Sequence, residues 1–129
     1  PNGIHLDIVD EGPVDAPVLI FLHGFPESHR TWRHQIAHFS GRFRCIAPDS
    51  RGYRGSSKPQ AVEAYTPDKL IGDVFLLADA LAIPHFTIVG HDWGGAIAWG
   101  VALGGQHARV TAAVIANAPH PVIFQRLLY

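Results

Sequence analysis

One ten-residue stretch, Thr87 to Ala96, constrains the fold of this chain more than any other. It starts with a short β-branched run, passes through GHDWG at 90–94 and continues into a small, apolar segment. A strand that ends here and a helix that begins here can approach closely, because the glycines two positions before and after the central residue carry no Cβ. The pattern predicts a nucleophile elbow, a tight strand-to-helix turn that leaves the Asp92 side chain above the end of the strand.

An aspartate at the centre of such a turn suits attack on a saturated carbon. Attack by serine on an sp³ carbon would leave an ether, which water does not cleave, whereas attack by Asp92 leaves an ester, which water can hydrolyse. The alternative interpretation is structural, because aspartate is a favoured N-cap and the positive end of a helix starting near Trp93 would stabilise its charge. On this stretch alone, both interpretations stay open.

Composition places the chain among globular proteins with a buried core. Its 129 residues suit one domain, and 47% of them are hydrophobic while 16% are charged. The formal net charge is −1 and basic residues do not cluster, so neither nucleic acid nor an anionic membrane is expected as a partner. No apolar run approaches the roughly 20 residues that span a bilayer, and the first residues show no signal-peptide pattern.

Cysteine and histidine usage predicts neither disulfides nor metal binding. The single cysteine, Cys45, lies in an apolar run, which predicts a buried structural thiol and favours a reducing, cytoplasmic location. Among nine histidines, His34 and His38 are four residues apart but lack the glutamate of an HExxH zinc motif. No cluster offers the four convergent ligands of a structural zinc site. We therefore expect neither a metal nor another cofactor.

Hydrophobic periodicity predicts strands and helices in alternation. Alternating and continuous apolar runs predict strands at residues 4–9, 18–22, 43–47, 86–89 and 110–116. Amphipathic or apolar segments with capping residues predict helices at residues 28–40, 66–83 and 93–103. Elements alternating at this spacing form an α/β fold, with a mostly parallel sheet and helices on both of its faces.

The carboxyl ends of the predicted strands bring polar segments to one edge of the sheet, where functional groups gather in such folds. These segments are residues 23–28, 49–55, 91–94 and 117–121. Within them, we expect His23, Gly24 and His91 to brace the loops through hydrogen bonds. We expect Asp49 and Arg51 to pin the loop that follows the third strand.

Five motifs then occur in the order and spacing of a known family. They are HGFPES at 23–28, a tryptophan in TWR at 31–33, APDSRGYRGSSKP at 47–59, GHDWGG at 90–95 and NAPHP at 117–121. Together they resemble the α/β-hydrolase family and, within it, the soluble epoxide hydrolases. The resemblance covers essentially the whole chain.

The resemblance implies a two-step hydrolysis of a small-molecule epoxide. Asp92 would attack a ring carbon, and water would then cleave the alkyl ester to release a diol. A tetrahedral intermediate on the Asp92 carboxyl carbon needs backbone N–H donors, which this family takes from the residue after the nucleophile and from an earlier loop, here Trp93 and Phe25. Phe25, Pro26 and Trp93 would also bind the substrate. We expect the Phe25–Pro26 bond to be cis, because the loop must reverse sharply.

Family members use further groups that this sequence does not contain. Tyrosines of a helical cap protonate the epoxide oxygen, and an acid and a histidine from the last strands activate water; all would follow Pro121. We therefore expect residues 1–121 to be the N-terminal part of the core and 122–129 the start of a cap, within a hydrolase of roughly 300 residues. The alternative is a non-catalytic chain, an incomplete sheet that pairs with a missing remainder or forms a homodimer through its open edge.

Two related activities use the same aspartate. Haloalkane dehalogenases resemble this chain in the tryptophan at Trp93, but Phe25 stands where they carry asparagine. Fluoroacetate dehalogenases clamp the substrate carboxylate with arginines one and four residues after the nucleophile, where this chain has Trp93 and Ala96. Indole and methyl groups cannot replace the paired donors of a guanidinium. Epoxide hydrolysis is therefore the favoured activity, and dehalogenation of a haloacid or haloalkane is the alternative.

Overall fold

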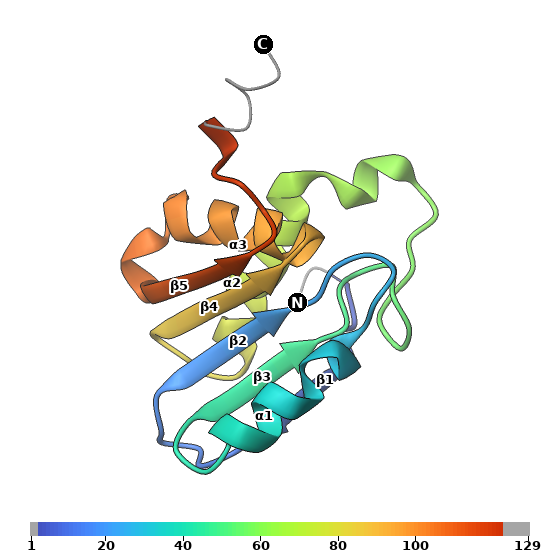
Figure 1. Cartoon of the computed structure of the whole chain (residues 1–129). Coiled ribbons are helices and arrows are strands. Elements are labelled where there is room, and N and C mark those ends of the chain that lie inside the picture. Colours follow the sequence, from blue (N-terminus) through green and yellow to red (C-terminus); the bar gives the residue numbers. More distant parts are fainter. Residues whose placement is uncertain (1–2, 123–129) are drawn as a thin grey trace.

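The computed structural model describes residues 3–122 and shows a five-stranded sheet with helices on both faces (Figure 1). The strands are β1 (Ile8–Glu11), β2 (Val18–Leu22), β3 (Arg44–Pro48), β4 (Phe86–His91) and β5 (Val110–Ala116). They lie in the order β1-β3-β2-β4-β5, with β1 antiparallel to β3 and all other neighbours parallel. The predicted α/β architecture is confirmed.

The helices divide between the two faces of the sheet. The described residues form the α-helices α1 (Arg33–Phe39), α2 (Pro67–Ala80) and α3 (Trp93–Leu103), and the 3₁₀ turns η1 (His29–Trp32), η2 (Val62–Tyr65) and η3 (His107–Arg109). α1 covers one face, while α2 and α3 lie together on the other (Figure 1).

The core has two layers, because successive residues of a strand point to opposite faces of the sheet. On the α1 face, Phe21 of β2 packs with Trp32 and Ile36. On the opposite face, Ile20 and Leu22 of the same strand pack with side chains of α2 and α3. Since both faces of β2 are covered, its sequence is apolar throughout instead of alternating.

The first strand is shorter and starts later than the predicted residues 4–9. β1 occupies only Ile8–Glu11, and the residues before it bond to the loop that follows β3. His5 N–H donates to Ser57 Oγ at 2.7 Å, and Ser57 N–H donates to His5 O at 2.8 Å. Asp49 N–H also donates to Asp7 O at 2.8 Å, so backbone and hydroxyl groups of the loop bond to this segment in place of a regular strand ladder.

The other predicted boundaries agree with the structure to within a few residues. β2, α3 and β5 have the predicted bounds, β3 lies one residue later, β4 continues to His91 and α2 ends at Ala80. The helix predicted at 28–40 begins as the 3₁₀ turn η1, in which Ser28 Oγ accepts from Arg30 N–H at 3.3 Å. Cys45 is a free thiol with 0% exposure, as predicted.

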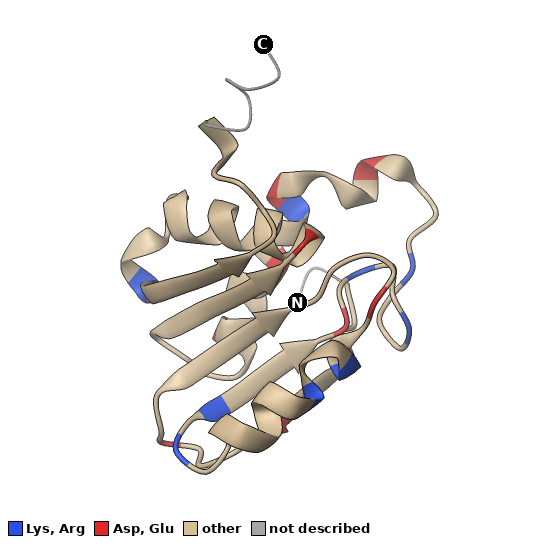
Figure 2. Ribbon diagram, in the orientation of Figure 1, with Lys and Arg blue, Asp and Glu red and all other residues tan. Residues whose placement is uncertain are grey.

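Charged residues of both signs are interspersed over the loops and helices, and the strands carry few of them (Figure 2). Within residues 3–122, no helix is both long enough and apolar enough to cross a membrane. The predicted start of a cap at 122–129 lies, apart from Val122, outside the described residues.

Candidate active site

β4 and α3 meet at a single residue, Asp92, whose backbone (φ 58°, ψ −124°) turns the chain from strand to helix. A positive φ is uncommon for a residue that has a side chain. The flanking glycines let the elements approach closely. A Cβ on Gly90 would lie 2.4 Å from the Gly94 carbonyl oxygen, between β4 and α3, and one on Gly94 would lie 2.2 Å from the carbonyl oxygen of Leu22 in the neighbouring strand β2. The predicted strand-to-helix elbow is therefore present, and close approach requires both glycines.

The Asp92 carboxylate faces the loop after β2. It makes no capping hydrogen bond to α3, and its Oδ2 accepts from the backbone N–H of Phe25 at 3.3 Å. The nearby backbone N–H of Trp93, and secondarily that of Phe25, stabilise the charged carboxylate and lower the pKa of Asp92 below its ordinary value. The carboxylate is therefore held in its ionised form, and the helix-cap interpretation does not describe this side chain.

The loop between β2 and η1 carries the Phe25 N–H to the elbow. Its Phe25–Pro26 peptide bond is cis, as predicted. The loop folds back on itself, because Glu27 N–H donates to Gly24 O and Gly24 N–H donates to Glu27 Oε1, both at 2.9 Å. A Cβ on Gly24 would lie 2.6 Å from the Cβ of Asp92, so only glycine fits there. The Phe25 side chain is 64% exposed, which leaves its ring open to a ligand.

His23 joins the two loops that border the elbow. It is 2% exposed, its Nδ1 lies 2.9 Å from Gly24 O, and its Nε2 accepts from Ser50 N–H at 3.0 Å. These partners assign the proton to Nδ1. Burial lowers the pKa of His23, so the ring stays neutral and Nε2 remains an acceptor.

Glu27 and His91 lie together beside the same turn. His91 Nδ1 is 3.6 Å from Glu27 Oε1, which is too long for a hydrogen bond, and it has no hydrogen-bond partner within the described residues. The contact is an ion pair whenever His91 is protonated. Sequence reasoning did not single out Glu27, although an acid three residues after a glycine in a tight turn often bonds to the backbone.

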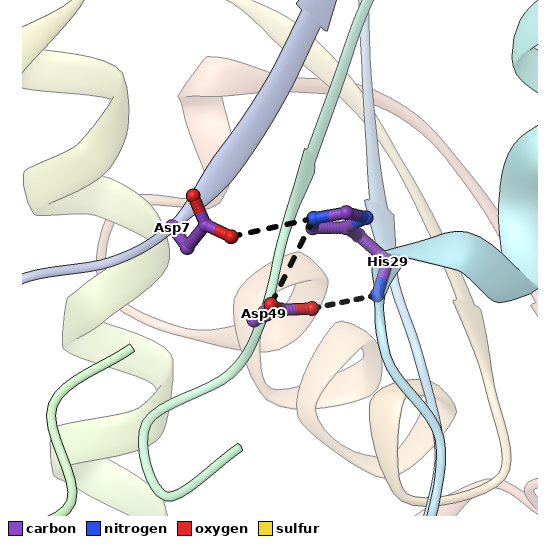
Figure 3. A group of neighbouring side chains, drawn as sticks. All are labelled: Asp7, His29 and Asp49. Atoms are coloured by element: carbon purple, nitrogen blue, oxygen red, sulfur yellow. Dashed lines mark hydrogen bonds and ion pairs between the residues drawn. The ribbon is translucent and has the colours of Figure 1, made fainter. Parts of the chain in front are cut away.

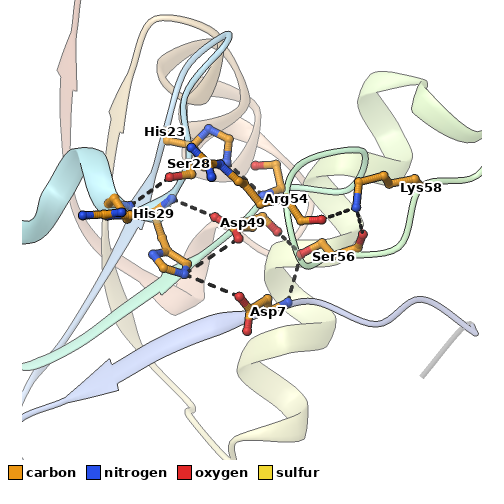
Figure 4. A network of polar contacts seen from close by, with 10 residues as sticks. Asp7, His23, Ser28, His29, Asp49, Arg54, Ser56 and Lys58 are labelled. Atoms are coloured by element: carbon orange, nitrogen blue, oxygen red, sulfur yellow. Dashed lines mark hydrogen bonds and ion pairs between the residues drawn. The ribbon is translucent and has the colours of Figure 1, made fainter.

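Asp49 and Arg51 anchor the loop that follows β3. Asp49 is 2% exposed; its Oδ1 accepts from His29 N–H at 2.8 Å, and its backbone oxygen accepts from Ser56 Oγ (Figure 4). Arg51 is 5% exposed and donates to both carboxylate oxygens of Asp73 in α2, at 2.9 and 2.7 Å. The loop is thus tied to η1 on one side and to α2 on the other.

Asp7, His29 and Asp49 form a polar cluster near the end of β3 (Figure 3). His29 Nε2 lies 3.6 Å from Asp7 Oδ2 and 3.7 Å from Asp49 Oδ2. In the part of the chain that the structure describes, this is the one group of three potential metal ligands. We assign the cluster a structural role, since it joins the segment before β1 to η1 and β3.

A cavity of about 200 Å³ lies beside the elbow, between α2 and α3. Leucine, isoleucine and valine side chains form much of its wall, together with Trp93, His23 and Tyr53. Tyr53 packs edge-on against His23, with ring centroids 4.7 Å apart. Burial, and secondarily the charge of Asp92, raises the pKa of Tyr53, so its hydroxyl stays protonated. Trp93 is 66% exposed, and one side of it borders this cavity.

The elbow and its neighbouring loops lie within a stretch that matches a known protein family. The sequence model of the alpha/beta hydrolase fold matches residues 17–128. The chain belongs to the α/β hydrolase family. The family resemblance drawn from the five motifs is thereby confirmed.

Solved structures of α/β hydrolases superpose closely on this one. A protein described among "novel epoxide hydrolases" from metagenomes of hot environments is 86% identical, with a TM-score of 0.97 over 100% of this chain and 43% of that chain. An epoxide hydrolase from Bacillus megaterium in complex with an inhibitor is 38% identical, with a TM-score of 0.93 over 98% of this chain and 44% of that chain.

Curated α/β hydrolase relatives carry the same activity in their names. Epoxide hydrolase A of Mycobacterium tuberculosis is 45% identical over 116 residues, which are 89% of this chain and 35% of the relative. Epoxide hydrolase 2 of Caenorhabditis elegans is 38% identical over 124 residues, which are 95% of this chain and 34% of the relative. The chain thus spans about a third of the length of these relatives.

Other aromatic residues of this α/β hydrolase pack in the core or along the cavity. Tyr65 also lines the cavity, and its hydroxyl donates to Pro59 O at 2.6 Å. Trp32 is buried, as expected of a core residue. Trp99 is half-buried, and its Nε1 donates to Ala118 O at 2.8 Å.

Proposed function

We propose that this chain carries the nucleophile of an epoxide hydrolase and that Asp92 attacks a carbon of the epoxide. The main support is geometric: the Asp92 carboxylate stands on a positive-φ turn, with one oxygen held by the Phe25 N–H. Relatives named epoxide hydrolase, at 37–47% identity, support the same reaction. Since the chain spans about a third of their length, we assign to it the nucleophile and its backbone donors.

In the first step, the carboxylate oxygen of Asp92 that Phe25 does not hold attacks an epoxide carbon. A C–O ester bond forms while the ring C–O bond breaks, and the ring oxygen leaves as an alkoxide that takes a proton from an acid. Oδ2, which accepts from Phe25 N–H, becomes the carbonyl oxygen of the ester. The Phe25 N–H therefore already points at the atom that will carry charge later.

In the second step, water adds to the ester carbonyl carbon and loses a proton to a base. The negative charge then develops on Oδ2, where fixed N–H donors of Phe25 and Trp93 would stabilise it without reorganisation. Collapse of this intermediate breaks the bond between the carbonyl carbon and the alkyl oxygen, and that oxygen takes the proton back from the base. The diol is released, and the Asp92 carboxyl group loses its proton to restore the carboxylate.

The charges around Asp92 favour a neutral substrate. A haloacid would bring a second carboxylate next to Asp92, and like charges in a partly desolvated site repel strongly. Trp93 and Ala96 offer no cation at the two positions where fluoroacetate dehalogenases carry arginine. Arg51 lines the cavity but is already paired with Asp73. An uncharged epoxide avoids this repulsion.

The proposal is tested by treating the 129-residue chain with styrene oxide and measuring its intact mass. We expect a gain equal to one styrene oxide, located on Asp92 by peptide mapping. Asp92→Asn keeps the side-chain shape but loses the charge, so it should stay unmodified. Fluoroacetate should leave the wild-type mass unchanged. An unmodified wild type, or faster fluoride release than epoxide consumption, would overturn the proposal in favour of dehalogenation.

The isolated chain should stop after one equivalent. Both ring nitrogens of His23 are occupied, and His91 faces Glu27, so the described histidines beside the elbow offer no base to the ester. Epoxide consumption should therefore plateau at one molecule for each chain, the ester should persist, and no diol should be released. Sustained turnover would show that one of these histidines reaches the ester.

A second candidate is non-catalytic association through β5, which could produce a homodimer. β5 lies at the edge of the sheet, and its residues 111–114 are exposed, Val114 at 58%. An open edge presents unpaired backbone groups to another strand. Light scattering tests this candidate: a dimer that becomes monomeric with Val114→Lys would support it, and a concentration-independent monomer would exclude it.

We further propose a cytoplasmic location, supported by the single, buried and free Cys45. We also propose that residues 1–121 are the N-terminal part of the hydrolase core and that residues 122–129 lead into a cap. A thiol titration of the purified native protein tests the proposed location. A reactive or oxidised Cys45 would argue against a structural thiol in a reducing compartment.

A further inference from the structure

We propose that the cavity between α2 and α3 binds an apolar substituent of the substrate, an aryl ring or a short alkyl group, and that Ile97 and Leu70 set the size it accepts. The inference rests on the proposed function: Asp92 would contact the epoxide carbon, and the cavity would contact another part of the same substrate. Ile97 lies one turn after Trp93 in α3, and Leu70 lies in the first turns of α2. The cavity wall thus comes from elements on the same face of the sheet (Figure 1).

The cavity has the size and lining for one ring. It measures about 200 Å³, and Leu6, Leu22, Leu70, Val74, Leu77 and Ile97 contribute its apolar surface. A cavity of about 150 Å³ lined by such side chains stays dry and binds benzene. An apolar group that enters exchanges water contact for contact with hydrocarbon, so the volume favours binding of a phenyl-sized substituent.

The charged groups in the wall do not oppose an apolar ligand. Arg51 and Asp73 both line the cavity, but they are 5% and 8% exposed and joined by two hydrogen bonds at 2.9 and 2.7 Å. Each side chain provides the charge and hydrogen-bond partners of the other, so neither needs a polar ligand. A charged substituent would find no free counter-ion among these two.

Asp92 itself does not line the cavity, but residues from separate segments that flank it do. Trp93 and Gly94, which line it, directly follow Asp92. His23, which also lines it, precedes the glycine whose backbone touches the Asp92 side chain. Tyr53 lies on the same wall and is close enough for the charge of Asp92 to raise its pKa. A substituent in the cavity would therefore extend from a carbon placed at Asp92.

The wall is held in place from several sides, so the space is not expected to collapse. Leu22 and Val74 belong to the buried core. Leu6 is held from both flanks, because His5 N–H donates to Ser57 Oγ and Asp7 N–H donates to Ser56 Oγ at 2.9 Å. Hydrogen bonds on both sides of Leu6 fix the position of its backbone over the cavity.

The first test measures binding without catalysis. Toluene is titrated into the 129-residue chain with labelled methyl groups, and methyl NMR shifts are followed. We expect the methyl signals of Leu70, Leu77 and Ile97 to shift and saturate. Ile97→Trp should abolish these shifts, and Leu70→Phe, from the opposite wall, provides a second blocking variant. Leu103→Trp is the matched control, because Leu103 lies in the same helix, 57% exposed and outside the cavity lining. Absence of saturable shifts at these methyls overturns the proposal.

The second test measures selectivity of the longest natural protein that contains this sequence. The ratio of kcat/KM for styrene oxide to kcat/KM for propylene oxide should fall roughly tenfold or more in Ile97→Trp and Leu70→Phe. The ratio should be unchanged in Leu103→Trp. An unchanged ratio in both blocking variants overturns the role in selectivity. Toluene binding in a protein whose Asp92 is never alkylated would instead defeat the proposed function and leave an apolar binding site that serves another ligand.

Discussion

Asp92 combines a functional side chain with an uncommon backbone. A residue other than glycine at positive φ typically costs about 1–3 kcal/mol, which the surrounding structure must offset. Here Asp92 N–H donates to Ala116 O at 3.1 Å, and Asp92 O accepts from Ala96 N–H at 3.0 Å. Its side chain accepts from Phe25 N–H. These bonds fix the turn from β5, α3 and the loop after β2, so the carboxylate is positioned before any substrate arrives.

Replacing Gly94 with alanine should destabilise the chain by about 3 kcal/mol. The added Cβ would lie 2.2 Å from the Leu22 carbonyl oxygen, and this oxygen belongs to the central strand and cannot move aside cheaply. Gly105→Ala is the matched control, because an added Cβ there meets no atom within 4 Å. Urea denaturation gives both free energies of unfolding. Equal stabilities for the two variants would contradict the close approach of strand and helix.

His23 should make stability depend on pH. Burial lowers its pKa in the folded state, so the unfolded chain binds a proton more readily than the folded chain. The free energy of unfolding should therefore fall as the pH drops below about 6.5, the ordinary value for histidine, towards the lowered value. His23→Gln carries no titrating group and should lose this part of the dependence. Urea titrations at several pH values between 7.5 and 5 compare the two; parallel curves would argue against a buried, neutral His23.

At the scale of elements, the Arg51–Asp73 pair fastens the loop after β3 to α2. Arg51→Met alone should cost about 3 kcal/mol, because it leaves the Asp73 carboxylate buried without a partner. The double variant with Asp73→Leu should recover much of that loss, since two apolar groups of similar volume need no partner. A double-mutant cycle by urea denaturation measures the coupling. Additive losses would mean that the two side chains do not act as a pair.

Sequence patterns predicted correctly those strands and helices whose own apolar residues determine the structure they form. The run at 18–22 has apolar residues on both faces and is covered on both. The segment 93–103 is apolar nearly all round and forms a helix with the predicted bounds, although Trp93 and Leu103 stay exposed. The prediction for residues 4–9 was partly wrong: the alternation fits a strand, yet the residues before Ile8 bond to Asp49, Ser56 and Ser57 of the loop after β3. Such partners, far away in the sequence, leave no mark on local periodicity.

The candidate site was predictable where a short motif determines the backbone. Gly90, Asp92 and Gly94 indicate the elbow by spacing alone, and the cis bond before Pro26 follows from the sharp loop. Asp73 was not predicted, because it lies among the leucines of α2 and its burial depends on Arg51, 22 residues earlier in the chain. Pairings of this kind depend on tertiary structure and are not encoded in either segment by itself.

At the scale of the whole molecule, stability should decrease from the central strand towards the edges. β2 lies between β3 and β4, and its last three residues are no more than 3% exposed, whereas most of β5 is exposed. We expect the amides of β2 to exchange hydrogen most slowly and those of β5 to exchange sooner, since exchange from edges needs only local opening. Hydrogen–deuterium exchange read by NMR tests this order. Equal protection of β2 and β5 would show that the sheet opens only as a unit.

The parallel pairing of β2 with β4 also sets a distance that matters for chemistry. Leu22 lies opposite Gly90, and from that level the chain continues three residues to Phe25 and two residues to Asp92. A slip of one residue would displace one strand by about 3.3 Å along the other, as far as the whole separation of 3.3 Å between Phe25 N and Asp92 Oδ2. The register of β2 against β4 therefore decides whether the Phe25 N–H reaches the Asp92 carboxylate.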